Sequence, residues 1–171
     1  DYNLDMEWEN LLRLENMADL KDRLHFNKVL PRDYVIGESS YKVALIVHIY
    51  FKDQIGYVLD YIENMPEGSD IYITSDTEEK LEMIREFSEK RGIKANYIKV
   101  GNRGRDVSAL LVGCKEYINN YDLVCFAHDK KTAHVRPLTI GESFSYKCFE
   151  NILGSKEYVK NIIRTFEEDK Y

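Results

Sequence analysis

Two short polar clusters contain the residues of this sequence whose types and spacing are best suited to chemistry. The first cluster consists of Asn102, Arg103, Gly104, Arg105 and Asp106, and the second spans residues 128–132 and contains His128, Lys130 and Lys131. Arginine presents a planar fork of donors that matches phosphate or carboxylate, lysine is a compact cation for phosphate oxygens, and histidine can donate when protonated. The two clusters therefore predict a site for a ligand that carries phosphate.

Each cluster directly follows an apolar run of strand length, residues 97–100 for the first and 123–127 for the second. Strands separated by a helix run parallel, so both clusters should open on the same edge of one sheet. That edge is where open α/β sheets bind ligands. Since the formal net charge of the chain is −6, a local concentration of cations indicates a phosphate-bearing ligand rather than a general attraction to polyanions.

Both clusters also have a purely structural interpretation. Gly104 allows a positive φ and close approach of the backbone to a ligand, and the amides of a helix that begins at Asp106 could face an anion. The Asp106 carboxylate, however, would repel a second negative charge. In the alternative, Asp106 is a helix cap, Gly104 is a turn residue and the arginines are solvated. The second cluster could likewise be a solvated surface loop.

The composition is that of an ordinary soluble protein of 171 residues, which predicts one domain with a substantial core. No apolar run approaches the roughly 20 residues needed to cross a membrane. The acidic net charge argues against nucleic acid as a partner. Because Cys114, Cys125 and Cys148 are odd in number and show no C-x-x-C pattern, we expect core thiols in a reducing compartment, with neither a disulfide framework nor a zinc site.

Hydrophobic periodicity predicts a doubly wound, mostly parallel sheet of about four strands with flanking helices. Residues 1–40 form an N-terminal helical segment, with an amphipathic helix over 4–24, and a connector; residues 41–171 form the α/β domain. The predicted strands are 41–50, 71–74, 97–100 and 121–127. A polar loop through Gly141, a helix near 143–153 and a last helix from residue 155 complete the chain, which gives two C-terminal helices.

Two of the intervening helices have predicted caps and inner faces. Ser75 and Glu78 are spaced as a capping box for a helix whose inner face is Leu81, Ile84 and Phe87. The helix after Asp106 is expected to bury five apolar side chains. These are Val107, Leu110, Leu111, Cys114 and Ile118.

Several enzyme signatures are absent from the sequence. It contains neither G-x-G-x-x-G nor the P-loop pattern, which argues against a dinucleotide oxidoreductase and an ordinary kinase. No serine lies in a glycine-flanked nucleophile elbow, and no histidine spacing fits a helical zinc site.

The order of the motifs along the chain resembles the rhamnan synthesis protein F family. The segments that carry the resemblance are residues 47–50, 70–74, 102–106, 121–124 and 128–132. The resemblance covers roughly Tyr41 to the C-terminus, and its N-R-G-R-D and H-x-K-K-[ST] motifs are fairly specific. Members of the family resemble glycosyltransferases of bacterial cell-surface polysaccharide assembly. The pattern is also similar to the first half of a GT-A glycosyltransferase fold, whose nucleotide-sugar site lies at the ends of these strands.

The resemblance implies a glycosyltransferase domain, with rhamnose as a candidate sugar, that uses a nucleotide-sugar donor. Residues 102–106 would shape the donor pocket, and His128, Lys130 and Lys131 would hold the diphosphate and stabilise its departure. His48 and Tyr50 would border the nucleotide. Asp76 could hydrogen-bond the base, or it could equally cap a helix.

Two departures from the GT-A pattern qualify that implication. Where the pattern has Asp-x-Asp to hold a divalent metal, this chain has His128 and Lys130, so we expect no metal and a direct clamp on the diphosphate. No general base is identified; Asp129, Glu142 and His134 are candidates. The family pattern continues beyond this sequence, so we interpret the chain as a fragment of a longer protein.

The rival interpretation is a non-catalytic nucleotide- or glycan-binding module that docks onto a partner transferase. In the catalytic interpretation the acceptor is a polysaccharide or a lipid-linked glycan, and docking to other polysaccharide-assembly proteins is compatible with both. The expected location is cytoplasmic, with the inner face of the membrane left open for the full-length protein.

Overall fold

The structure, a computed structural model, describes residues 3–14, 16, 19, 29–131 and 136–168. Its contacts divide the chain into two units, Asp1–Leu30 and Pro31–Tyr171. In the first unit, α1 (Leu4–Leu14) carries Leu4, Trp8 and Leu11 exposed along one side. The part of the predicted helix over residues 20–24 lies outside the described residues.

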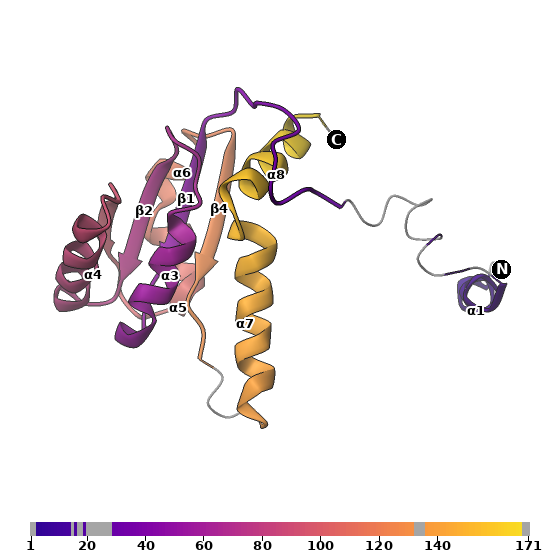
Figure 1. The fold of residues 1–171 in the computed structure, drawn as a ribbon. Helices are drawn as coiled ribbons and strands as arrows, with labels where there is room; N and C mark the ends of the chain where they lie inside the picture. Colours follow the sequence, from indigo (N-terminus) through magenta and orange to yellow (C-terminus); the bar gives the residue numbers. More distant parts are fainter. Residues whose placement is uncertain (1–2, 15, 17–18, 20–28, 132–135, 169–171) are drawn as a thin grey trace. The chain divides into compact units, whose positions relative to one another are not determined.

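The second unit is built on one parallel sheet, as predicted. The strands are β1 (Val43–His48), β2 (Asp70–Ser75), β3 (Asn96–Lys99) and β4 (Leu123–His128). Their order in the sheet is β3-β2-β1-β4, and every pairing is parallel. Figure 1 shows β2, β1 and β4 side by side in this order. The chain thus builds outward from β1 to β3 and then crosses to the other side of β1. The direction of winding reverses between β1 and β4, which is where such sheets form a ligand crevice.

Helices cover both faces of the sheet (Figure 1). The helical elements are η1 (Lys52–Gln54), α3 (Ile55–Ile62), α4 (Glu78–Lys90), α5 (Arg105–Ser108), the π-helical turn η2 (Ala109–Gly113), α6 (Lys115–Ile118), α7 (Leu138–Leu153) and α8 (Lys156–Glu168). The packing clusters place α3, α4, α7 and α8 against one face, and the α5–α6 segment against the other. None of the described helices has the length and apolarity needed to cross the hydrocarbon core of a membrane.

The central strand β1 explains why the sequence contains a continuous apolar run there. Leu45 and Val47 pack into the cluster with α3 and α7, while Ala44 and Ile46 pack into the cluster on the opposite face. All six residues of β1 are buried. A strand covered on both faces has no solvated side, so its side chains are apolar at every position rather than at alternate ones.

The strand boundaries lie within about two residues of the predicted ones, but the cap of α4 was predicted wrongly. Thr77 is the N-cap, and its hydroxyl accepts a hydrogen bond from the amide of Lys80 at 3.3 Å. Ser75 instead ends β2 and donates to the carbonyl of Ile49 at 2.6 Å. The predicted inner face was also incorrect at Phe87, which is exposed, because the buried positions follow the helical repeat to Ser88.

The segment after residue 106 also differs from the prediction. The π-helical turn η2 interrupts the helix and changes the angular spacing of the side chains. Val107 and Leu111 are exposed, contrary to the prediction, whereas Cys114 is buried as predicted and Ala109 is buried without having been predicted. Leu110 and Ile118 pack against the core as expected.

Two further expectations were wrong in the C-terminal part. The predicted polar loop through Gly141 is helical, because α7 begins at Leu138, directly after its N-cap Pro137. Proline suits a helix start because it lacks an amide hydrogen that would remain unpaired there. Cys148 is exposed on α7 rather than a core thiol; Cys114 is buried and Cys125 is half-buried.

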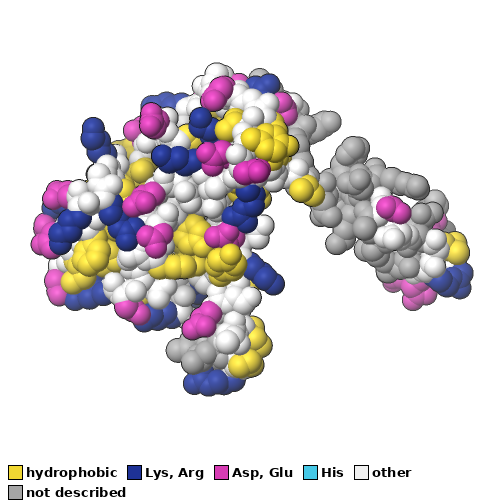
Figure 2. Space-filling view, viewed as in Figure 1, with side chains coloured by type: hydrophobic (Ala, Val, Ile, Leu, Met, Phe, Trp, Pro, Cys, Tyr) yellow, Lys and Arg dark blue, Asp and Glu magenta, His cyan; other side chains and the backbone are white. Residues whose placement is uncertain are grey.

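The surface seen in Figure 2 carries basic and acidic side chains close together, with smaller hydrophobic patches between them. Opposite charges at this spacing largely cancel at a distance. The face seen in Figure 2 therefore has no broad region of a single charge sign.

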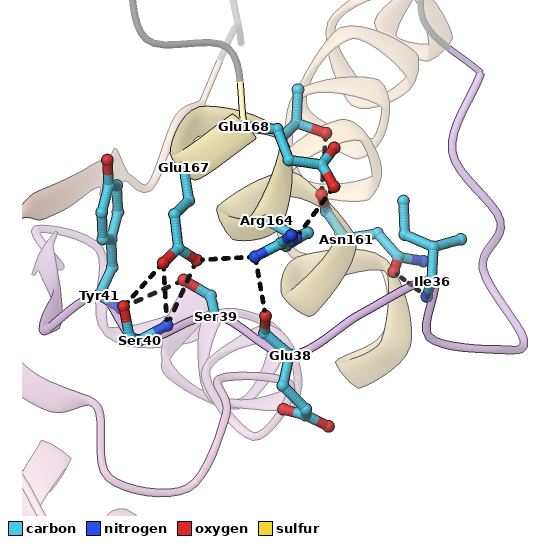
Figure 3. Close-up of polar contacts among 10 residues, drawn as sticks. Ile36, Glu38, Ser39, Ser40, Tyr41, Asn161, Arg164, Glu167 and Glu168 are labelled. Atoms are coloured by element: carbon cyan, nitrogen blue, oxygen red, sulfur yellow. Dashed lines mark hydrogen bonds and ion pairs between the residues drawn. The ribbon is translucent and has the colours of Figure 1, made fainter.

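The connector before β1 is held against α8 by side-chain hydrogen bonds (Figure 3). Asn161 is fully buried; its Oδ1 accepts from the amide of Ile36 at 2.8 Å, and its Nδ2 donates to the carbonyls of Pro31 and Tyr34, each at 2.9 Å. One side chain thus pairs three main-chain groups that a helix or sheet would otherwise have to satisfy.

We predict that Asn161→Ala lowers the free energy of unfolding by about 2–4 kcal/mol, because it removes three hydrogen bonds to the connector, each typically worth about 0.5–1.5 kcal/mol. Asn151→Ala is the matched control, since Asn151 is exposed and its side chain donates within α7, to the Lys147 carbonyl at 2.7 Å. Urea unfolding of both variants checks this. Equal stability of the two variants would show that the connector does not depend on Asn161.

A second prediction concerns Glu167, which lies beside the same connector (Figure 3). The hydroxyls of Ser39 and Ser40, the Ser40 amide and Arg164 lower the pKa of Glu167 to about 2. A depressed pKa stabilises the fold above the unfolded-state pKa, and that stability is lost as the pH falls toward 2. Stability measured from pH 5 to 2 should therefore decline less steeply in Glu167→Gln than in the parent. Identical slopes would contradict this assignment.

Candidate ligand-binding site

A cavity of about 380 Å³ opens at the carboxyl edge of the sheet, where β1 and β4 end. It is lined by three segments that are far apart in the sequence. They supply His48, Tyr50 and Phe51; Asn102, Arg105 and Asp106; and His128, Asp129, Lys130 and Lys131. The structure thus brings the two polar clusters of the sequence to one cavity, together with the end of β1.

The buried side chain of Asp129 joins the loops that follow β1 and β4. Its Oδ2 accepts hydrogen bonds from the amides of Tyr50 at 2.9 Å and Phe51 at 2.6 Å. Its own amide donates to the carbonyl of His48 at 3.1 Å. Burial raises the pKa of the Asp129 carboxyl, and the two amides oppose that shift. This candidate base is therefore engaged in holding the backbone of the site.

His48 lies at the end of β1 and is only 4% exposed. Its Nδ1 is 2.9 Å from Oγ1 of Thr74, a residue of the neighbouring strand β2. The same hydroxyl donates to the carbonyl of Val47 at 3.3 Å. Burial lowers the pKa of His48, so the imidazole is neutral near pH 7.

Asp106 and His128 bring the two polar clusters into contact. Asp106 Oδ2 lies 3.6 Å from His128 Nε2, and His128 Nδ1 lies 2.8 Å from the carbonyl oxygen of Asp129. The prediction that Asp106 caps a helix was wrong, because Gly104 is the N-cap and α5 already begins at Arg105. Consecutive positive φ values at Gly104 and Arg105, 96° and 54°, turn the chain at this point.

The cations of the two clusters occupy different surroundings. Arg105, Lys130 and Lys131 line the cavity, whereas Arg103 and Gly104 are outside its lining. Lys131 forms an ion pair with Asp53 and lies 5.1 Å from the centroid of the Phe51 ring. The ammonium of Lys130 lies 5.8 Å from the centroid of the Phe144 ring.

Asp76 lies beside the cavity rather than in its lining. Its Oδ1 accepts a hydrogen bond from Lys80 Nζ at 2.6 Å, and that ammonium lies 3.9 Å from the centroid of the Tyr50 ring. Since Thr77 caps α4, the capping role considered for Asp76 is excluded. Asp76 therefore positions Lys80 against Tyr50, whose hydroxyl is 3.4 Å from Asn102 Nδ2.

The sequence did not indicate the parts played by Phe51 and Thr74. Phe51 could have been recognised because it is an aromatic residue directly after Tyr50. Nothing in the sequence distinguishes Thr74 from an ordinary strand residue. Of the candidate bases, Glu142 is exposed on α7 and outside the cavity lining, and His134 lies outside the described residues. Within the described residues, no group of three or more His, Cys, Asp and Glu side chains is placed to hold a metal ion.

The fold and the cavity define an α/β protein with a cation-bearing ligand site at the carboxyl edge of a parallel sheet. Comparison with protein families matches residues 1–171 to the family described as rhamnan synthesis protein F. The chain belongs to this family, which indicates a role in the synthesis of rhamnan, a polysaccharide. Searches of curated proteins and of solved structures returned no match.

We predict that Gly104→Ala destabilises the protein more than Gly68→Ala. Both glycines have positive φ values, 96° and 86°, which cost an alanine roughly 1–2 kcal/mol. A Cβ at Gly104 would also lie 2.9 Å from Cβ of Ser108, whereas nothing lies within 4 Å of a Cβ at Gly68. Thermal unfolding of the two variants checks the difference. A larger loss at Gly68 would show that the turn before α5 relaxes without cost.

Proposed function

We propose that this chain is the donor-binding domain of a glycosyltransferase that uses a nucleotide-sugar, with a rhamnosyl donor as the candidate, in polysaccharide biosynthesis. The observation that carries the proposal is the combination of Arg105, Lys130 and Lys131 around one cavity, at the point where the sheet reverses its winding. The family's link to rhamnan synthesis supports a polysaccharide as the product, and the cations support a phosphorylated compound as the donor.

The cavity offers different chemistry to the two ends of such a donor. Arg105 and Lys130 supply charged donors for phosphate oxygens, and Lys131 does so if a ligand displaces its ion pair with Asp53. Tyr50 and Phe51 supply aromatic surface for the base, in an edge-to-face pair with ring centroids 5.1 Å apart. Asp106 is unfavourable for phosphate, so the diphosphate should lie nearer to Arg105 and Lys130.

In the proposed reaction an acceptor hydroxyl attacks the anomeric carbon of the donor. The bond from that carbon to the diphosphate oxygen breaks, the nucleoside diphosphate leaves with the electron pair, and the acceptor hydroxyl releases its proton to the solvent. Preorganised cations stabilise the charge that develops on the leaving oxygen, an effect typically worth about 3 kcal/mol for one donor. His128, Lys130 and Lys131 are the residues that we propose for this role. The acceptor is a polysaccharide or a lipid-linked glycan.

A non-catalytic nucleotide- or glycan-binding module remains the second candidate, and one observation favours it. The carboxylate of Asp129 accepts from two backbone amides, so one of the two acidic residues in the cavity lining is committed to holding the backbone. Transfer of the sugar from a nucleotide-sugar to a glycan acceptor distinguishes the two candidates. A module would bind the donor without turnover.

We predict that inorganic pyrophosphate and deoxythymidine diphosphate (dTDP) bind with the same affinity in the presence and absence of a chelator. Lys130→Ala should weaken both about tenfold to a hundredfold, because a hydrogen bond to a charged group contributes roughly 1.5–3 kcal/mol. Isothermal titration calorimetry measures the affinities. Lys94→Ala is the matched control, since Lys94 is exposed and precedes the amino end of β3, at the opposite edge of the sheet.

A strict requirement for magnesium or manganese would contradict the direct contact between cations and diphosphate. Equal affinities of the Lys130 and Lys94 variants would remove Lys130 from the proposed site. If neither pyrophosphate nor dTDP binds the parent protein, the proposed function is wrong for this cavity.

A further inference from the structure

The hydrogen bonds around His48 indicate which of its ring nitrogens carries the proton. Thr74 Oγ1 has a single hydrogen, which it donates to the carbonyl of Val47, an acceptor that cannot donate in return. With that hydrogen assigned to the Val47 carbonyl, the hydroxyl accepts from His48 across the 2.9 Å contact, and we assign the ring hydrogen to Nδ1. In the neutral imidazole the other nitrogen, Nε2, then carries a lone pair and no hydrogen.

His48 is thus a neutral acceptor in a cavity whose lining also contains three cationic donors, Arg105, Lys130 and Lys131. The groups that face it electrostatically are Asp106, Asp76, His128 and Lys80, and only Asp106 and His128 among them line the cavity with it. A bare imidazole nitrogen repels an ionised phosphate oxygen and favours a hydroxyl group. The cavity therefore combines cations for phosphate with a separate, buried acceptor for a hydroxyl.

We propose that Nε2 of His48 accepts a hydrogen bond from a hydroxyl of the bound donor, on either its pentose or its transferred sugar. This inference rests on the proposed function and adds a residue that selects for a sugar hydroxyl. His48 acts as a specificity and positioning residue, oriented by Thr74, while the cations hold the diphosphate. The inference requires that loss of the His48 acceptor weakens only ligands that bring a hydroxyl to it.

Three ligands separate the sources of the hydroxyl in calorimetric titrations. Pyrophosphate has no sugar, dTDP adds the deoxyribose hydroxyl, and dTDP-rhamnose adds the hydroxyls of the transferred sugar. If the pentose supplies the hydroxyl, His48→Asn should weaken dTDP and dTDP-rhamnose about fivefold to twentyfold. If the transferred sugar supplies it, only dTDP-rhamnose should weaken. Pyrophosphate affinity should be unchanged in both cases.

His48→Gln tests whether the acceptor position itself matters. The side-chain amide of asparagine reaches the position of Nδ1, whereas that of glutamine extends to the position of Nε2 and can present an oxygen there. Glutamine should therefore recover most of the affinity that asparagine loses. A purely structural role for His48 would give two variants that differ in melting temperature but not in their ranking of the three ligands.

Thr74→Val provides a test that leaves His48 in place. It removes the hydroxyl that holds the hydrogen on Nδ1, so the acceptor at Nε2 is no longer enforced, and the hydroxyl-bearing ligand should weaken as in His48→Asn. Ser75→Ala is the matched control, because Ser75 is a buried β2 hydroxyl that donates to a carbonyl, that of Ile49, without touching His48. Ser75→Ala should keep the parent's ligand ranking.

The outcomes separate this inference from the proposed function. If the parent binds pyrophosphate and dTDP-rhamnose, but His48→Asn weakens all three ligands equally or none of them, the inference is wrong and the proposed function stands. Equal ligand rankings for Thr74→Val and Ser75→Ala would also overturn it. If the parent binds none of the three ligands, both proposals are wrong.

Discussion

The candidate site depends on one buried carboxylate, that of Asp129, at the point where the sheet reverses its winding. Parallel strands have no hairpin to align their ends, so the loops that follow β1 and β4 need another connection. Asp129 provides this connection. Its carboxylate accepts hydrogen bonds from two amides after β1, and its own amide donates a hydrogen bond to the carbonyl of His48. Removing this carboxylate would leave two part-buried amides without their partner, which lowers stability.

The strand order then determines which side chains meet. Because β1 lies between β2 and β4, His48 pairs in register with Thr74 on one side and with His128 on the other. The loop after β3 reaches the same cavity through Asn102, Arg105 and Asp106, although β3 is at the far side of the sheet. The cavity lining therefore combines cations from the loop after β4 and from α5 with a neutral acceptor, His48, from the end of β1. A phosphorylated sugar has a phosphate that matches the cations and hydroxyl groups that match the acceptor.

Sequence reasoning recovered the features that depend on local pattern. The apolar run of β1 predicted the sheet, and the polar clusters after β3 and β4 predicted the edge that carries the site. Both patterns can be recognised in the sequence without knowing which residues are in contact in the folded protein. It missed the Thr77 cap, the π-helical turn after α5 and the contact between Asp106 and His128. The contact depends on side chains distant in sequence, and the other two on a choice between nearly equivalent local arrangements. The contact between His48 and Thr74 depends on the register of β1 and β2, and hydrophobic periodicity does not specify that register.

The central claim is that a nucleoside diphosphate binds at the carboxyl edge of the sheet. Amide chemical shifts of the 15N-labelled chain, followed while dTDP is added, test it most directly because they locate the ligand without assuming any residue's role. The account predicts saturable shifts concentrated at residues 48–51, 102–106 and 128–131. Shifts concentrated instead around the cavity of about 400 Å³ that includes Glu38, Gly68 and Lys160 would contradict it.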